Sequence, residues 1–194
     1  MMSSANLSVI LDANVLYSAP IRDLLLNLAE QELYQPKWSE DIEEEWIRNI
    51  LKNRPDLVQE NLKRTARAMN DAFPRAKIES YQHLITTISL PDPDDRHVVA
   101  AALRGSVDAI VTFNTKDFPR NLLKSEYQML ILDPDNFILK LAEINIELTQ
   151  KAFLGQLKSL KKPPISKDRL IEILRKCGLK ESLKLFDDLI PEDS

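Results

Sequence analysis

The feature that most constrains this fold is the alternation of short apolar runs with longer helical segments. Residues 7–11 form a short apolar run with β-branched side chains, and 109–112 and 128–132 are further short, mainly apolar runs, as buried strands are. Apolar residues recur at helical spacing in three segments. The first covers 20–34, the second begins at Ser39 and ends at Pro55, and the third covers 57–73. Tight hairpin signals between these runs are missing, so the strands are expected to pair in parallel within an α/β layer structure.

Residues 77–90 are harder to assign. The run 84–88, Leu-Ile-Thr-Thr-Ile, looks β-rich and is expected to be extended. Residues 91–95 read as a turn that feeds a helix over 96–104, where three alanines allow close packing and Gly105 ends the helix.

The character of the chain changes near residue 145, after which only helical patterns occur. Lys161 to Pro164 form a break, Ser166 can cap a helix over 168–177, and a short helix is expected over 180–190. We therefore predict an α/β domain over residues 1–144 and a helical C-terminal extension over residues 145–194.

Composition removes several chemistries. The three glycines are far apart, which excludes a Walker loop and a dinucleotide fingerprint. A lone Cys177 cannot form an internal disulfide or a cysteine-based zinc site, and His83 and His97 cannot build a histidine-rich metal centre by themselves. Carboxylates remain plentiful, with 30 acidic against 26 basic side chains.

The sequence shows neither a signal peptide nor an apolar stretch near the roughly 20 residues that span a bilayer. The scarcity of cysteine fits a reducing compartment, so we expect a cytoplasmic protein without a membrane partner.

The net charge of −4 argues weakly against nucleic-acid binding, but the charge is unevenly distributed. Residues 48–77 carry eight basic and three acidic side chains, and residues 151–180 carry nine basic and two acidic ones. Solvated helix faces explain these stretches as well as phosphate contacts do.

Carboxylates follow two of the expected strands. Asp12 ends the first strand and Asp117 lies in the loop after 109–112, so parallel neighbours would bring both to the same rim of the sheet. Asp12 borders apolar residues on both sides, where a charge must be paired or metal-bound. Asp94 and Asp95 begin a helix and could simply cap it, and the sequence leaves their rim open.

Four segments together resemble the PIN domain, a superfamily of metal-dependent ribonucleases. Residues 9–16 resemble its opening motif, 95–102 its acid-plus-alanine helix and 110–118 its last motif. Residues 39–46 resemble the segment that supplies the family's glutamate, which falls on Glu45. The resemblance covers about residues 7–142 and implies a three-layer α/β/α fold with a central parallel sheet.

The resemblance also implies a site. Asp12, Asp95 and Asp117 would hold Mg²⁺ or Mn²⁺, with Glu45 acting directly or through water as a fourth catalytic residue. The form Asp-Pro-Asp-Asp-Arg leaves open whether Asp92 or Asp94 shares the role of Asp95. Among the polar neighbours, Thr112 and Asn114 would orient a carboxylate, a water or a phosphate. Asn14 would fix the turn after the strand. His97 is expected to be an ordinary helix residue.

Small bacterial PIN proteins are most often VapC-like toxins, so the resemblance implies a metal-dependent endoribonuclease of a type II toxin–antitoxin pair. Its partners would be RNA, an antitoxin with a DNA-binding domain and a second copy of the chain. Residues 145–194 resemble the extra C-terminal region of one PIN subgroup. The alternative is a catalytically silent PIN scaffold that binds RNA or protein. A dehalogenase-like phosphatase is disfavoured, because Asn14 stands where a second aspartate is needed.

Overall fold

A computed structural model describes residues 7–161 and 163–189 of the chain. Its centre is a five-stranded sheet with the order β3-β2-β1-β4-β5, in which every neighbouring pair is parallel. The predicted α/β class with a central parallel sheet is therefore confirmed. The strands are β1 (Ser8–Leu11), β2 (Gln35–Ser39), β3 (Lys77–Ile78), β4 (Ala109–Val111) and β5 (Leu130–Leu132).

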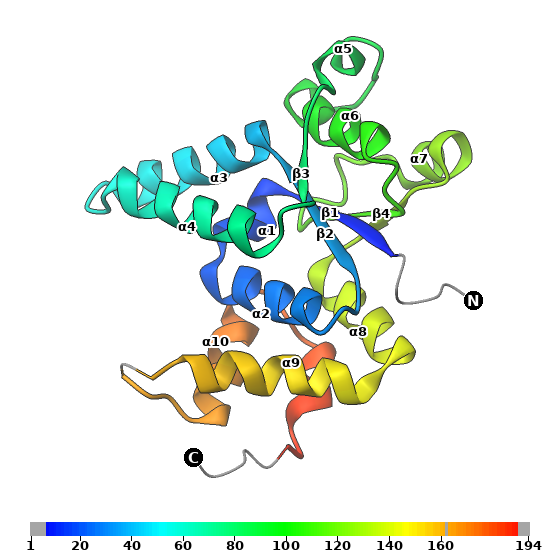
Figure 1. Cartoon of the computed structure of the whole chain (residues 1–194). Helices are drawn as coiled ribbons and strands as arrows, with labels where there is room; N and C mark the ends of the chain where they lie inside the picture. Colours follow the sequence, from blue (N-terminus) through cyan, green and yellow to red (C-terminus); the bar gives the residue numbers. More distant parts are fainter. Residues whose placement is uncertain (1–6, 162, 190–194) are drawn as a thin grey trace.

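Helices cover both faces of this sheet, with α6 and α7 on one side and α2 and α8 on the other (Figure 1). The helix α3 and its neighbour α4 form an arm beside the sheet, and the C-terminal helices stack beyond α2. The helices are α1 (Ala13–Tyr17), α2 (Ala19–Glu30), α3 (Glu40–Asn53), α4 (Gln59–Ala72), α5 (Gln82–Ile85), η2 (Pro93–Asp95), α6 (Arg96–Arg104), α7 (Arg120–Tyr127), α8 (Pro134–Ile144), α9 (Ile146–Ser159), α10 (Lys167–Lys176) and η3 (Ser182–Phe186).

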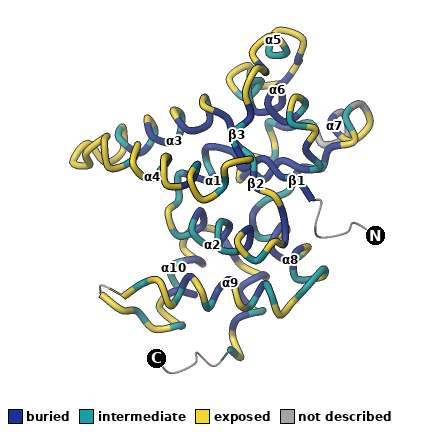
Figure 2. The backbone as a smooth tube through the Cα atoms, viewed as in Figure 1, coloured by how far each residue is buried: buried dark blue, intermediate teal, exposed yellow. Residues whose placement is uncertain are grey.

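The two central strands are buried on both faces. In β1, Val9 to Leu11 have no exposed surface, and Ile110 and Val111 of β4 have none either. Continuous apolar strands are expected where helices cover both sides of a parallel sheet. Figure 2 shows buried residues along the strands and exposed ones at the outer end of the α3–α4 arm. None of the described helices is long and apolar enough to cross a membrane.

The prediction of an extended segment over residues 84–88 was wrong. Residues Gln82–Ile85 form α5, and a turn follows it. The amide of Leu84 donates to the carbonyl of Tyr81, and both the amide and the hydroxyl of Thr87 donate to the carbonyl of Leu84. These local hydrogen bonds replace the strand ladder that the β-branched composition favoured.

The strand β2 was not predicted from the sequence, because it contains Pro36 and proline is unusual in a central strand. The strand tolerates it because β3 pairs only with Trp38 and Ser39, so no ladder bond on that side needs an amide from Pro36. On the other side the amide of Gln35 donates to the carbonyl of Leu7 over 2.7 Å.

The C-terminal helices share the core of the α/β part. Gln156 of α9 donates to the carbonyl of Pro20 in α2 over 2.9 Å. Phe153 of α9 stacks on Phe186 of η3, with ring centroids 4.3 Å apart. The helix after Ser166 is confirmed as α10, and η3 lies within the range of the last predicted helix. The boundary between residues 144 and 145 stays a prediction.

Because α9 is part of this core, we expect one cooperative unfolding transition for the whole chain. Phe153→Ala removes a fully buried ring and should lower the free energy of unfolding by about 3–5 kcal/mol, as measured by urea denaturation. Ile146→Ala, at an exposed position of the same helix, is the control and should change little. A separate early transition of the C-terminal helices would contradict this prediction.

Candidate active site

The order of the strands reverses between β1 and β4. From β1 the chain proceeds to β2 on one side, whereas from β4 it proceeds to β5 on the other. Ligands of open α/β sheets bind at this point, beyond the carboxyl ends of the strands. Leu11 pairs with Val111, so Asp12 and Thr112 leave the two strands side by side.

Asp12 is a buried carboxylate with three hydrogen-bond donors. Its side chain is 3% exposed and caps α1 by accepting from the amide of Ala13 over 2.7 Å. The hydroxyl of Thr112 donates to its Oδ2 over 2.7 Å and Asn14 Nδ2 over 2.6 Å. Burial raises the pKa of Asp12, and the bonds from Thr112 and Ala13 only oppose this rise.

Asn14 and Thr112 join the ends of the two strands. Asn14 Oδ1 accepts from the amide of Phe113 over 3.0 Å, and Thr112 Oγ accepts from the amide of Asn114 over 3.0 Å. Thr112 thus makes the contact with a carboxylate that was predicted for it. Asn14 does more than fix the turn after β1, because it connects that turn to the loop after β4.

Three further carboxylates converge beside Asp12. One oxygen each of Asp92, Asp95 and Asp117 lies within 4.8 Å of the other two, a group that could hold a metal ion. Asp92 accepts from the amide of Asp94 at the start of η2, and Asp117 accepts from Asn114 Nδ2. Asp94 is exposed and stands outside this group.

Asp95 has the least favourable environment in this three-acid group. Its Oδ2 is buried and has no hydrogen-bond partner among the described residues. Burial, and then the charges of Asp12, Asp92, Asp117 and Glu45, raise the pKa of Asp95 to about 7. An oxygen without a donor, surrounded by like charges, fits a hard cation that takes carboxylate ligands.

Glu45 faces the aspartates from α3. Its Oε2 lies 3.1 Å from His97 Nε2 of α6, and its charge contributes to the raised pKa values of Asp12 and Asp95. Burial lowers the pKa of His97, but the hydrogen bond to Glu45 and the charges of Glu45, Asp41 and Asp12 together outweigh burial, so the pKa of His97 is raised. His97 is therefore a partner of an acid rather than an ordinary helix residue.

The neighbouring Glu43 has a structural role. It is buried, accepts from Asn70 over 2.7 Å and pairs with Lys77 over 3.1 Å. The sequence pattern could not separate these glutamates, because only the tertiary contacts distinguish them. It also missed the link between Glu45 and His97, which are far apart in the chain.

Comparison with known proteins agrees with this arrangement. The PIN domain family matches residues 8–116, and the VapC50 C-terminal domain matches residues 134–185. The chain therefore belongs to the PIN domain family, and the resemblance to VapC-like PIN proteins with a C-terminal extension is confirmed.

One relative is the Mycobacterium tuberculosis protein named "Putative ribonuclease VapC50", which is 40% identical over 80 residues. These residues are 41% of this chain, and they span about half of that protein, 47% of its length. No solved structure matched the chain.

The raised pKa of Asp95 predicts how stability depends on pH. Between its ordinary value of 3.8 and about 7, the folded metal-free protein binds more protons than the unfolded chain. Its free energy of unfolding therefore falls as the pH rises through this window. Asp95→Asn should flatten this dependence and stabilise the metal-free protein near pH 8, as measured by urea denaturation with chelator.

The control is Asp94→Asn, which alters an exposed acid outside the three-acid group. An Asp95→Asn variant with the same pH dependence as the unaltered protein would show that the crowding of charge at Asp95 is misassigned.

Proposed function

We propose that this protein is a metal-dependent endoribonuclease that hydrolyses RNA phosphodiester bonds. The observation that carries the proposal is the buried, unpartnered Oδ2 of Asp95 among the carboxylates at the reversal point of the sheet. Membership of the PIN domain family and similarity to a protein named as a ribonuclease support it.

The cation would be Mg²⁺ or Mn²⁺, since carboxylate oxygens suit hard ions. Asp95 and Asp117 would hold it, together with Asp12 and with Asp92, one of the two aspartates that the sequence left open beside Asp95. When bound, such an ion lowers the pKa of a water molecule and stabilises charge on the phosphate.

The protein's own residues supply positioning and proton transfer. Thr112, Asn14 and the amide of Ala13 fix the orientation of Asp12 before any substrate arrives. Glu45 lies outside the three-acid group, and its Oε2 is hydrogen-bonded to His97 Nε2. Glu45 would therefore be placed to accept the proton of the attacking water. Asn114 would orient Asp117 or a phosphate oxygen.

We also propose that the chain is the toxin of a type II toxin–antitoxin pair in the cytoplasm. The support is the match of its C-terminal region to the VapC50 C-terminal domain. Its partners would then include an antitoxin with a DNA-binding domain and a second copy of the chain. A silent PIN scaffold that binds RNA or protein without cleaving is the competing outcome.

The decisive assay is cleavage of mixed RNA by purified protein with Mg²⁺ or Mn²⁺. Chelator should abolish the activity, and Asp12→Asn should do the same. Thr112→Val keeps the side-chain shape but loses the donor to Asp12, so it should lower the rate about 10–100-fold. Asp94→Asn is the matched control, because it alters a neighbouring acid that the proposal does not use.

Two results would contradict the proposal. Equal cleavage by the unaltered protein, the Asp12→Asn variant and the chelated sample would show that the activity does not come from this site. RNA binding without cleavage under either metal would favour the scaffold.

A further inference from the structure

The segment from Gly178 to Ser182 is fixed at the edge of the sheet that carries the acids. The helix α8 begins there, directly after β5, with Asp135 in its first turn. Asp135 accepts from the amides of Lys180, Glu181 and Ser182 over 2.9–3.0 Å and from the hydroxyl of Ser182 over 2.6 Å. The C-terminal region therefore returns to the rim of the candidate active site.

At this rim the segment meets Phe113. Gly178 has a positive φ of 111°, and a Cβ added there would lie 3.0 Å from Phe113 Cε1. The ring therefore rests against a position that only glycine leaves open. The backbone of Phe113 is held from the other side, because its amide donates to Asn14 Oδ1 in the network around Asp12.

Phe113 is nevertheless 38% exposed. Among the described residues the other large exposed apolar side chains are Leu57, Val58 and Ile146, and none of them is aromatic. Phe113 follows Thr112, the donor to Asp12, and precedes Asn114, the donor to Asp117. A fixed, exposed ring thus stands between two residues that hold the carboxylates.

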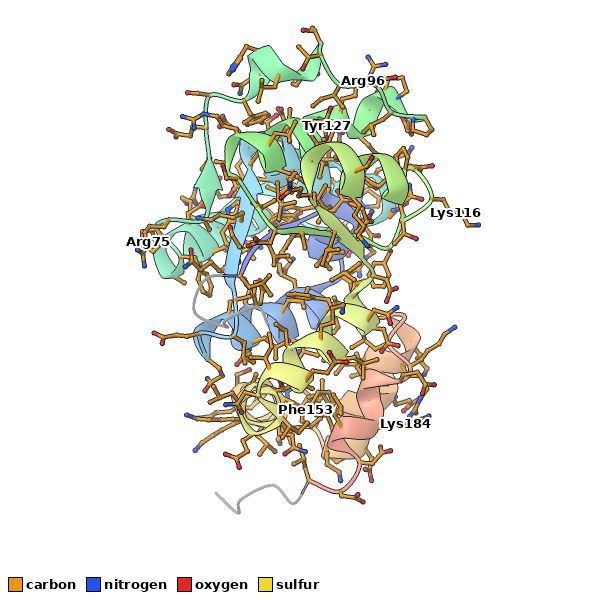
Figure 3. All side chains as sticks on the ribbon, turned by 90° about the vertical axis from the view of Figure 1, so that its right-hand side faces the viewer. Arg75, Arg96, Lys116, Tyr127, Phe153 and Lys184 are labelled. Carbon is orange, nitrogen blue, oxygen red and sulfur yellow. The ribbon has the colours of Figure 1, made fainter. Side chains whose placement is uncertain are left out.

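Positive side chains occur in both of the segments that meet at this ring. Arg175 and Lys180 lie on either side of Gly178, Lys116 follows Phe113 in the loop after β4, and all three are exposed. None of the three has an ion pair within residues 7–161 and 163–189. In Figure 3, Lys116 extends into solvent on the same side of the molecule as η3, where Lys184 is labelled.

We propose that Phe113, supported by Gly178 of the C-terminal region, is the platform on which an unpaired RNA base stacks beside the bond to be cleaved. Arg175, Lys180 and Lys116 contact the adjoining phosphates. The inference rests on the proposed nuclease function and adds the residues that would hold a base and its phosphates beside the acids. Bases of single strands can splay onto an aromatic ring, whereas those of a duplex are already stacked on each other.

The first test measures binding of a fluorescein-labelled single-stranded RNA to full-length protein carrying Asp12→Asn, by fluorescence anisotropy. Adding Phe113→Ala should weaken binding about 10-fold, since stacking on an aromatic side chain contributes that much per base. Phe113→Trp should restore binding. Ile146→Ala is the matched control, because it removes an equally exposed apolar side chain on α9 and should leave the affinity unchanged.

A second variant tests the support of the ring by the C-terminal region. Gly178→Ala places a methyl group against Phe113 and should reproduce the loss of binding, with thermal unfolding recorded to show that the fold persists. Arg175→Ala should weaken binding of every single-stranded sequence and reduce its dependence on salt.

The outcomes separate this inference from the nuclease proposal. If the unaltered protein cleaves RNA and Phe113→Ala cleaves single-stranded RNA with the same KM, the platform is refuted and the nuclease stands. If Phe113→Ala weakens single- and double-stranded RNA equally, stacking on the ring is also refuted. If the unaltered protein cleaves no RNA with either metal, the nuclease proposal itself fails.

Discussion

Carboxylates are crowded at the β1–β4 reversal point, where burial and like charge both disfavour their ionised forms. Burial disfavours the ionised form of Asp12, and burial with four neighbouring acids raises the pKa of Asp95 to about 7. A fold gains no stability from such an arrangement. The surrounding residues hold it in place: Thr112, Asn14 and the start of α1 secure Asp12, and Asn114 secures Asp117. Under the proposed function, a cation bound by these acids would give the unpartnered oxygen of Asp95 its partner.

The C-terminal region belongs to this arrangement rather than being a separate appendage. The helix α9 packs on α2, and the stacked Phe153 and Phe186 extend the core beyond the sheet. Asp135 then fixes the segment after α10 at the acid rim through four hydrogen bonds. The same segment supplies the glycine that supports Phe113. Changes in the C-terminal helices should therefore be measured for effects on stability and, if the proposed platform is right, on RNA binding as well.

Local patterns in the sequence predicted what depends on local physics. The buried runs of β1 and β4 indicated parallel strands, and the position of Asp12 and Asp117 after them indicated a shared rim. Residues 84–88 were misread, because hydrogen bonds to the carbonyls of Tyr81 and Leu84 overrode β-branched composition. The resemblance placed the family's glutamate on Glu45 and left Asp92 and Asp94 open, but the structural role of Glu43, the choice of Asp92 over Asp94 and the pairing of His97 were beyond prediction. Each depends on contacts between distant elements, such as α3 with α6, that no local spacing encodes.

Calorimetric titration of the metal-free protein with Mn²⁺ near pH 7 would show whether the crowded acids bind a cation. A carboxyl group with a pKa of about 7 is partly protonated at this pH and must lose its proton to bind a cation. Binding should therefore release a fraction of a proton per molecule. The heat of binding should then vary with the ionisation enthalpy of the buffer, and Asp95→Asn should abolish both the binding and the proton release. Equal binding by the unaltered protein and by Asp95→Asn, or a heat independent of the buffer, would contradict the account.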